Sequence, residues 1–582
     1  MINMVQNAKD QAAALAMAAY QAAVADGTLP QAEVKTAPVE IPKDTANGDF
    51  TTTFALAASK ALRQPPRNIA QALLDHMDLA GSYFASAEIA GPGFLNFRLN
   101  DSWYAAVCEA VESEGAGYGT ADHLKGQKIM VEFVSANPTG PMHMGNARGG
   151  VLGDTLASVL AACGADVTRE FYVNDAGHQI DKFAHSIEAR YLQIIRGEDA
   201  VPFPEDGYQG EDIKDLARAY YEKNGDKLLD VPEAERQEAL AQFGLSINLP
   251  KMKTDLERYK IHYDNWFYES SLHESGYVKE TVDLLAERGW TYEKDGALWL
   301  RTADILRDHY RRQGKKEADI EKLDLKDDVL RRANGFYTYF AADIAYHRNK
   351  FAVRGFDKVI NIWGADHHGH VARLQAALDG LGLDGSHRLV IVLMQLVNLM
   401  QDGKPVRMSK RSGKAIALHD LLDEISVDAA RYFFNSRAST SPLDFDLDLA
   451  VREDSENPVY YVQYAHARIC SLLSRLAEEG EKVPAAEAVD AGVMTTPEEL
   501  ALIKALAQYP EEIHLAARDY DPSRINRYLV ALAGDFHRFY NACRIKGEEP
   551  TVLSARLKLA DTVRAVLANG MGLLGVSAPE KM

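Results

Sequence analysis

The chain has 582 residues, 47% of them hydrophobic and 25% charged, and its 64 basic and 84 acidic side chains give a net charge of −20. This composition is typical of a water-soluble globular protein of roughly three or four domains, and no apolar run approaches the roughly 18 residues of a membrane span. The overall acidity argues against a surface devoted wholly to nucleic acid, because affinity for nucleic acid depends on contacts with phosphates.

The N-terminus and the cysteines indicate the compartment. The chain begins with an Ala-rich helical stretch and lacks the basic and apolar regions of a signal peptide. Cys108, Cys163, Cys470 and Cys543 lie far apart and form no Cys-x-x-Cys pair. We therefore expect reduced thiols in a cytoplasmic protein without a structural zinc site.

Residues 1–115 are predicted to form a first α/β unit. The Ala-rich helix is followed by a second helix from Asn68 to Met77. The unit ends in a turn at Gly91-Pro92-Gly93 and the strand-like run Phe94 to Leu99. On the residues alone this could be an autonomous capping domain.

A nucleotide-binding core is predicted over 120–440. Lys128 to Val134 is apolar and β-branched enough for a buried strand, Pro138, Gly140 and Pro141 interrupt it, and helical spacing begins at Gly145. A strand, a tight loop and a helix N-terminus are the geometry with which an α/β sheet holds a nucleotide. His143 would lie at the mouth of that helix.

The segment after the second predicted strand, Val167 to Val173, is charged and helical in pattern. We expect residues of about 180–335 to form an insertion between the halves of the sheet, without a clear β-rich module. The core is expected to resume with Phe336 to Tyr346, Val359 to Trp363 and Leu389 to Leu393.

The pattern His-x-Gly occurs twice, at His143-Met144-Gly145 and at His367-His368-Gly369. From 17 His and 41 Gly in 582 residues, chance alone predicts about 1.2 copies, so the pattern carries weight only in its structural context. Either histidine could instead pack in a core or cap a helix.

Residues 404–414 read Lys-Pro-Val-Arg-Met-Ser-Lys-Arg-Ser-Gly-Lys, with five cations and no anion. Such a loop suits a polyphosphate, because Ser and Gly let backbone N–H groups approach phosphate oxygens while the cations supply charge. A solvated surface loop is an equal alternative on the residues alone.

After the helix that begins at Asp428, residues 450–582 are predicted to form a helical bundle. Its basic side chains Arg524, Arg527 and Arg538 alternate with aromatic ones. Aromatic side chains can stack on unpaired bases, but at helical spacing they more often belong to a core. The aromatic residues of this stripe are Tyr528, Phe536, Phe539 and Tyr540.

Two sequence signatures resemble those of the class I aminoacyl-tRNA synthetases, and the chain closely resembles the arginyl-tRNA synthetases. The first signature of that family, Ala-Asn-Pro-Thr-Gly-Pro followed by His-x-Gly-His, is matched by Ala136 to Asn146. The second, Lys-Met-Ser-Lys, is matched by Arg407-Met408-Ser409-Lys410. The stretches 335–347 and 364–370 also resemble the family, which accounts for the second His-x-Gly.

Two departures from the signatures concern charge. Asn146 stands where the family has a second His, and Arg407 stands where it has a Lys. An amide can still donate to a phosphate but carries no charge, whereas Arg keeps the charge in a different geometry.

The resemblance implies an arginine–tRNA ligase that forms an arginyl-adenylate from ATP and then transfers arginine to tRNA. It implies a multidomain α/β protein, with a Rossmann-like catalytic domain, an N-terminal additional domain that contacts tRNA and a C-terminal anticodon-binding bundle. His143, Asn146, Lys410 and Arg407 would act on the phosphates. The implied ATP contacts are Ala136, Asn137, Pro138, Thr139, Gly140, Pro141, Met142, His143, Met144, Gly145, Asn146, Met408, Ser409 and Lys410.

The resemblance also implies a carboxylate-lined arginine pocket, since a guanidinium is always charged. Asp343 and Glu132 would bind its charged ends, with Ser135, Asn137 and Tyr339 completing the pocket, and Asp366 or His367 on the same wall. On sequence grounds Asp343 could instead be an acid near a helix N-terminus.

The implied partners are arginine-specific tRNA, L-arginine and ATP with Mg²⁺, for a protein that is monomeric and not membrane-bound. The candidate tRNA contacts are Arg524, Arg527, Arg538 and Tyr540. Three alternatives remain: a cysteinyl-tRNA synthetase, which would need a zinc cluster of cysteines; a small-molecule nucleotidyltransferase, which would not need two extra domains; and a non-catalytic tRNA-binding paralogue, against which His143 and Lys410 argue.

Overall fold

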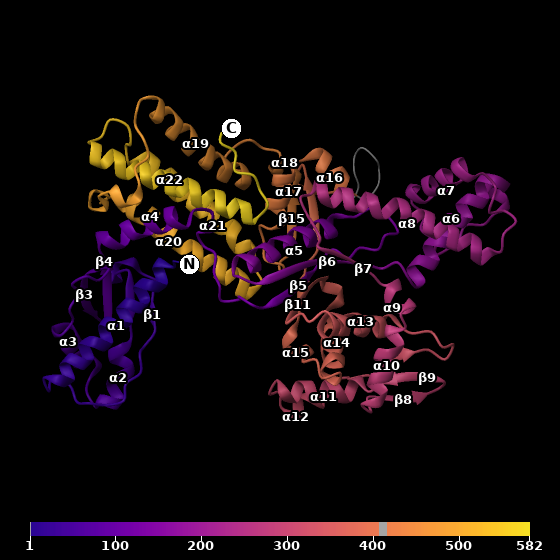
Figure 1. Ribbon diagram of the computed structural model, residues 1–582, viewed down its shortest axis with the longest axis horizontal. Helices are drawn as coiled ribbons and strands as arrows, with labels where there is room; N and C mark the ends of the chain where they lie inside the picture. Colours follow the sequence, from indigo (N-terminus) through magenta and orange to yellow (C-terminus); the bar gives the residue numbers. More distant parts are fainter. Residues whose placement is uncertain (1, 407–415) are drawn as a thin grey trace.

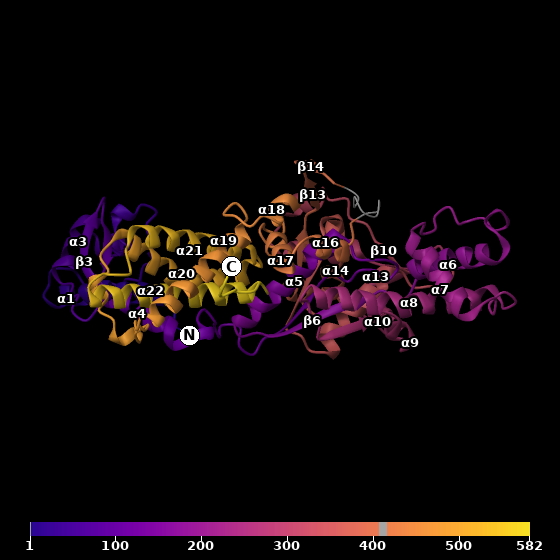
Figure 2. The same ribbon diagram turned by 90° about the horizontal axis from the view of Figure 1, so that it is seen from above.

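The structure is a computed structural model that describes residues 2–406 and 416–582. The molecule is elongated, with the N-terminal unit at one end and a unit of three helices at the other (Figures 1 and 2). The C-terminal helices lie between the N-terminal unit and the central sheet. Within the described residues, no helix is long and apolar enough to cross a membrane.

The N-terminal unit packs helices on a four-stranded antiparallel sheet of order β1-β2-β4-β3. The long helix α1 (Met4–Ala25) buries alanines at helical spacing, such as Ala8, Ala12 and Ala16, which lets it approach its neighbours closely. The predicted second helix and final strand are present as α3 and β4. The other elements are β1 (Val39–Glu40), β2 (Phe50–Thr52), α2 (Phe54–Leu62), α3 (Pro66–Asp75), β3 (Phe84–Ala90) and β4 (Phe94–Leu99).

A five-stranded parallel sheet of order β12-β11-β5-β6-β7 forms the centre of the molecule. Its strands are β5 (Lys128–Glu132), β6 (Asp166–Val173), β7 (Asn265–Tyr268), β11 (Lys358–Gly364) and β12 (Leu389–Met394). The strand order reverses between β5 and β11, so the carboxyl ends of these two strands flank a topological switch point, where open α/β sheets bind ligands. This confirms the predicted Rossmann-like parallel sheet.

Helices cover both faces of this sheet. Ile129 and Val131 of β5 pack in one hydrophobic cluster with α5 (Met144–Ala162), whereas Met130 packs in another with α13 (Tyr339–Arg348) and α14 (His368–Gly380). This alternation is the period-2 pattern of a strand buried on both faces.

The segment expected as one helical insertion, about 180–335, is divided by β7. Its first part is a helical unit with its own core, and its last part carries the three-stranded antiparallel sheet β10-β9-β8. The strand β7 joins the central sheet, and its Trp266 stacks on Phe171 at 4.3 Å between ring centroids. Because β7 has only four residues, its hydrophobic pattern is too short to show the two-residue period of a strand, and the sequence did not predict it.

The bounds within this segment are as follows. The first unit contains α6 (His178–Arg196), α7 (Glu211–Asn224) and α8 (Glu233–Arg258). After β7 come α9 (Ser270–Glu274), α10 (Tyr277–Glu287), β8 (Thr291–Lys294), β9 (Ala297–Leu300), α11 (Thr302–Arg312), α12 (Glu317–Ile320) and β10 (Asp328–Arg331).

A second small sheet follows the central one, with strand order β14-β13-β15. It consists of β13 (Val397–Gln401), β14 (Lys404–Pro405) and β15 (Leu443–Asp446). The short helices α17 (Val427–Phe434) and α18 (Leu447–Ala450) pack against it. Two other short helices are α15 (Gly385–Arg388), which packs on α14, and α16 (Leu418–Glu424), which packs on α5.

The predicted C-terminal helical bundle is present as α19 (Pro458–Glu478), α20 (Pro497–Asp519), α21 (Ser523–Ala542) and α22 (Pro550–Leu573). Thr496 and Glu499 form a capping box that fixes the start of α20. Each helix carries an apolar stripe at helical spacing, which the bundle buries.

The bundle shares a core with the N-terminal unit and with one face of the central sheet. The helix α4 (Asp101–Glu114) lies between the N-terminal unit and the bundle, and Trp103 Nε1 donates to Met4 O at 3.0 Å. Tyr118 Oη donates to Leu506 O at 3.1 Å across the same junction. One hydrophobic cluster therefore extends from α1 through α5 to α22.

Candidate active site

Two adjoining cavities lie at the carboxyl ends of β5 and β11, where the strand order reverses. The first has a volume of about 1320 Å³ and the second of about 800 Å³. Val134, His143, Asn146 and His367 line both cavities. The switch point of the sheet therefore carries a divided pocket that could hold two ligands side by side.

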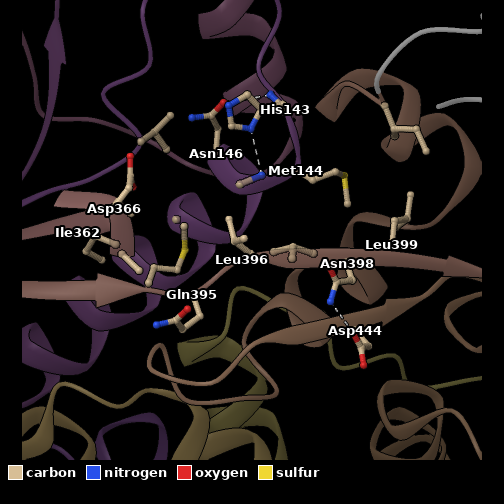
Figure 3. A pocket seen from close by; sticks show the side chains of 18 of the residues that line it. His143, Met144, Asn146, Ile362, Asp366, Gln395, Leu396, Asn398, Leu399 and Asp444 are labelled. Atoms are coloured by element: carbon tan, nitrogen blue, oxygen red, sulfur yellow. Dashed lines mark hydrogen bonds between the residues drawn. The ribbon is translucent and has the colours of Figure 1, made fainter. Parts of the chain in front are cut away.

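His143 and Asn146 cap the N-terminus of α5 and face the first cavity (Figure 3). His143 Nδ1 accepts from the Gly145 N–H at 3.2 Å, so the neutral ring carries its proton on Nε2. Burial lowers the pKa of His143, which favours this neutral form. The Asn146 Oδ1 accepts from the His143 N–H at 3.0 Å, which leaves its NH₂ group to donate to a ligand.

The loop after β5 has two residues in the left-handed region. Val134 has φ 66° and Ser135 has φ 42°, and a β-branched residue in this region is a genuine outlier. The Ser135 hydroxyl fixes the loop, because it donates to Glu132 Oε1 and accepts from the Tyr172 N–H, both at 3.1 Å. Such strained backbone clusters at ligand sites.

The first cavity has one polar side and one apolar side. His143, Asn146 and Asp366 form the polar side, and Leu396, 79% exposed, projects from the other (Figure 3). Asn398 Nδ2 donates to Asp444 Oδ1 at 2.9 Å at the far end. A flat apolar ring with a polar, anionic tail would match this division. The remaining apolar lining residues include Ile362, Met394, Val397, Leu399, Met400, Val406 and Ile416.

The residues that sequence reasoning assigned to ATP divide between the cavities. Met144 and Gly145 line the first, and Ala136, Asn137, Thr139, Gly140 and Pro141 line the second. Pro138 and Met142 are buried and line neither. Arg407, Met408, Ser409 and Lys410 lie outside the described residues.

The candidate arginine-binding residues are also divided. Ser135, Asn137, Tyr339 and His367 line the second cavity, whereas Asp366 lines only the first. Of the two residues between which the sequence did not decide, His367 is thus the one that borders the second cavity.

Asp343 and Glu132 both have partners within the protein. Asp343 is the fifth residue of α13, beyond the first turn, and its carboxylate contacts His370 Nε2 at 3.0 Å. It is therefore not an acid of the helix N-terminus. Glu132 forms a buried ion pair with Lys350, with Nζ and Oε2 at 2.5 Å.

Sequence reasoning missed Glu269, which follows β7. Its side chain is buried, with 3% of the residue exposed. With the Asn174 amide turned so that its nitrogen faces Glu269, this nitrogen donates to Oε2 at 3.1 Å, and His273 Nε2 lies 3.5 Å from Oε1. Among the described residues, no Lys or Arg forms an ion pair with Glu269.

The Tyr172 hydroxyl bonds to Glu269 and feels the charges of two further carboxylates. The pKa of Tyr172 is well above its usual value because the side chain is buried and because the charges of Glu269, Asp343 and Glu132 act on it. We call these three residues the carboxylate cluster. The only sequence signal near Glu269 is the aromatic run Trp266-Phe267-Tyr268 before it. This run has the composition of a strand but is too short to show a strand period.

A buried hydrogen-bonded chain connects the Glu132 carboxylate to the backbone carbonyl of Asp343. From Glu132 it passes through Lys350 to Asn361 Oδ1 at 3.3 Å, and Asn361 Nδ2 donates to His347 Nε2 at 2.7 Å. His347 Nδ1 then donates to Asp343 O at 2.8 Å. Burial, together with the Lys350 charge, holds the pKa of His347 well below its usual value, so its ring is neutral.

The basic aromatic stripe of α21 mostly faces the core. Tyr528, Phe536 and Phe539 are buried, as their helical spacing favours on general grounds. Tyr540 is half-buried beneath Arg468, whose guanidinium carbon lies 4.2 Å from the ring centroid.

The three candidate arginines have carboxylate partners on their own bundle. Arg524 pairs with Glu512 at 3.0 Å, Arg527 with Asp521 at 3.2 Å, and the exposed Arg538 with Asp535. Arg524 and Arg527 also line a cavity of about 390 Å³ between α20 and α21.

A different group of aromatic side chains reaches the surface of the bundle. Tyr460 and Tyr464 both belong to α19, and their rings stack on each other with 6.0 Å between centroids. His537 of α21 lies against Tyr461 and Tyr464. We call these four residues the aromatic face. Tyr464 is 39% exposed.

Three family models together match most of the chain. They are the arginyl tRNA synthetase N terminal domain over residues 11–99, the catalytic domain of class I (R) tRNA synthetases over 109–442, and the DALR anticodon binding domain over 462–582.

Individual proteins agree with the family models. The arginine–tRNA ligase of Acetivibrio thermocellus is 51% identical and that of Caldanaerobacter subterraneus 49% identical, each over 582 residues that cover 100% of both chains. The solved arginyl-tRNA synthetase of Thermus thermophilus superposes with a TM-score of 0.71 at 23% identity, over 98% of this chain and 99% of that one, and supports the same fold. The chain therefore belongs to the arginyl-tRNA synthetase family of class I aminoacyl-tRNA synthetases.

Proposed function

We propose that the chain ligates L-arginine to its cognate tRNA in two steps on the divided pocket. The arginine carboxylate attacks the α-phosphate of ATP and pyrophosphate leaves. A terminal ribose hydroxyl of the tRNA then attacks the carbonyl carbon of the adenylate, and AMP leaves. The observation that carries this proposal is the junction of the two cavities at His143 and Asn146. Two residues that line the second cavity connect it to the carboxylate cluster, because Ser135 bonds to Glu132 and the turned Asn174 amide bonds to Glu269.

ATP would occupy the first cavity. Its adenine suits the apolar side around Leu396, and Asp366 at the end of β11 can accept from ribose hydroxyls. The phosphates would then meet the N-terminus of α5, where the His143 Nε2–H and the Asn146 amide donate and the helix dipole favours negative charge. Within the described residues, no group of three or more His, Cys, Asp or Glu side chains could hold a metal ion. Mg²⁺ would arrive with ATP, bound mainly by phosphates and water.

Arginine would lie in the second cavity, with its guanidinium directed at the carboxylate cluster. Lys350 already balances the charge of Glu132, so Glu269 and Asp343 are the carboxylates that we assign to the guanidinium. Glu132, Ser135 and Asn137 would then face the ammonium end, and Tyr339 and His367 would form the wall. This arrangement directs the arginine carboxylate toward the junction of the cavities.

The chemistry would need no covalent intermediate with the protein. Placing the carboxylate in line with the α-phosphate removes much of the entropic barrier, and fixed donors stabilise the charge that develops. His143 and Asn146 would supply those donors from one side. Arg407 and Lys410 are assigned to the opposite side by resemblance alone.

The tRNA would contact the N-terminal unit and the C-terminal bundle. We assign its unpaired bases to the aromatic face, because exposed aromatic rings can stack on bases. Arg524, Arg527 and Arg538 would contribute only after leaving their ion pairs, and Tyr540 only after leaving the Arg468 guanidinium. We expect a cytoplasmic monomer.

The test is ATP–pyrophosphate exchange with each of the twenty amino acids, with and without tRNA. Of the twenty amino acids, only arginine should support exchange, and only arginine should then be attached to tRNA. Exchange with another amino acid, or charging without exchange under any condition, would contradict the proposed reaction.

A further inference from the structure

Arg148 is a buried guanidinium whose hydrogen bonds go to backbone carbonyls. It is the fifth residue of α5 and is 1% exposed. Its Nη1 donates to Gln395 O at 2.8 Å, and its Nη2 donates to Ala438 O at 3.0 Å and to Ser441 O at 2.9 Å. Among the described residues, no carboxylate forms an ion pair with it. Burial lowers the pKa of Arg148 to about 10, which reflects the cost of placing this charge inside the protein.

The three carbonyls belong to two connections between strands. Gln395 lies between β12 and β13, and residues 438–441 precede β15. The two connections also bond to each other, because the Gln395 N–H donates to Ser439 O at 2.9 Å and the Leu443 N–H donates to Leu396 O at 3.1 Å. Arg148 lies against both and ties them to α5.

The first connection is one side of the first cavity. Met394, Gln395, Leu396, Val397 and Asn398 line that side, and residues at the start of α5 line the opposite one (Figure 3). Arg148 therefore joins the helix that carries the phosphate donors to the segment that would hold the adenine. The two sides could not shift relative to one another without breaking its hydrogen bonds.

We propose that Arg148 is a positioning residue that sets the width of the first cavity for the adenine nucleotide. The inference rests on the proposed function, since it takes ATP as the occupant. It needs no contact between Arg148 and ATP. A shorter or neutral side chain would release the 394–398 segment from α5, which would weaken ATP binding while the second cavity keeps its shape.

The test compares Arg148→Lys, which keeps the charge, and Arg148→Gln, which keeps a single donor group, with a matched control. The control is Arg431→Lys. Arg431 is equally buried at 1% and donates to Leu574 O, Tyr259 O and Lys260 O, and to Asp154, but none of these residues lines the first cavity. Both Arg148 variants should raise the KM for ATP by about tenfold or more, the effect of one lost charge-assisted hydrogen bond, with the KM for arginine unchanged.

Calorimetric titration of ATP into the full-length variants gives a readout that does not depend on arginine being the substrate. It should show the same loss of ATP affinity in the two Arg148 variants and wild-type affinity in Arg431→Lys. Folded Arg148 variants with wild-type ATP affinity would overturn the inference. So would an equal rise of both KM values, or unfolding of both Arg148 variants at a temperature where Arg431→Lys stays folded, because Arg148 would then be a general stabiliser. If the wild-type chain bound ATP but showed no arginine-dependent exchange, the proposed function would fail while the positioning role was still measured.

Discussion

Replacing Glu269 by Gln tests the carboxylate cluster most directly. The substitution keeps the size of the side chain and removes its charge. Glu269 is 3% exposed, and its partners among the described residues are an amide, an imidazole and the Tyr172 hydroxyl, so the guanidinium would be its main cation. Two charge-assisted hydrogen bonds at about 1.5–3 kcal/mol each amount to about 3–6 kcal/mol. At about 1.4 kcal/mol per tenfold, kcat/KM for arginine should fall by roughly 10²- to 10⁴-fold.

Citrulline provides the internal comparison, because its ureido group has the shape of a guanidinium without the charge. Citrulline forms no ion pair with Glu269, so Glu269→Gln should change kcat/KM for citrulline little. The arginine-to-citrulline ratio of kcat/KM, measured by pyrophosphate exchange with tRNA present in every assay, should therefore fall by roughly the same two to four orders of magnitude.

The matched control for this experiment is Glu170→Gln. Glu170 is another fully buried carboxylate of the same sheet, but Arg354, Tyr346 and Asn265 already bind it. This control should lower thermal stability and leave the arginine-to-citrulline ratio unchanged. An unchanged ratio in Glu269→Gln would refute the guanidinium assignment and leave Asp343 as its remaining partner.

Further predictions concern the buried chain and the bundle. Lys350→Met leaves the Glu132 carboxylate buried without a cation and should cost about 3–5 kcal/mol. Thermal unfolding of Lys350→Met beside wild type measures this deficit; equal stability of the two proteins would argue against an uncompensated buried charge. Because the pKa of His347 is lowered in the folded state, its contribution to stability is present above pH 6.5, the usual pKa, and declines by up to about 1.4 kcal/mol per pH unit below it. His347→Asn should accordingly flatten urea-unfolding stability between pH 6.5 and pH 5, and an unaltered slope would assign the acid sensitivity to other groups. Tyr464→Ala should raise the KM for tRNA by roughly 5- to 150-fold, the cost of about 1–3 kcal/mol for one stacked base, at unchanged KM for ATP and arginine; a wild-type KM for tRNA would remove Tyr464 from the RNA surface.

The sequence predicted the first half of the nucleotide fold because its signals there are local. The apolar strand, the prolines 138 and 141 and the renewed helical period after Gly145 each determine the backbone within a few residues. The C-terminal helices were also predictable, because long apolar stripes at a period of 3.6 residues are hard to mistake.

The parts of the candidate site that escaped prediction depend on contacts between distant segments. Glu269 gains its surroundings only when β7 pairs with β6, and a four-residue strand carries no period of its own. Asp366 and His367 are neighbours in sequence and both border the first cavity, but only His367 also borders the second, and the turn after β11 determines this difference. From the sequence, Arg148 resembles an ordinary solvent-facing cation of a helix. Its burial depends on the connections at 395 and 438–441, which lie far away in the sequence and whose carbonyls accept its hydrogen bonds.

The core that joins α1 to α22 has a consequence for the synthesis of the protein. Met4 and Trp103 are buried at a junction that also contains Tyr118, whose hydroxyl bonds to Leu506 of α20. The ribosome adds roughly 5–20 residues per second, so the first helix emerges roughly half a minute to two minutes before its last packing partner. During that interval α4 and α5 expose apolar surfaces that no earlier part of the chain can cover. Completion of this core must therefore wait until α22 has emerged, and until then the exposed apolar surfaces are open to aggregation.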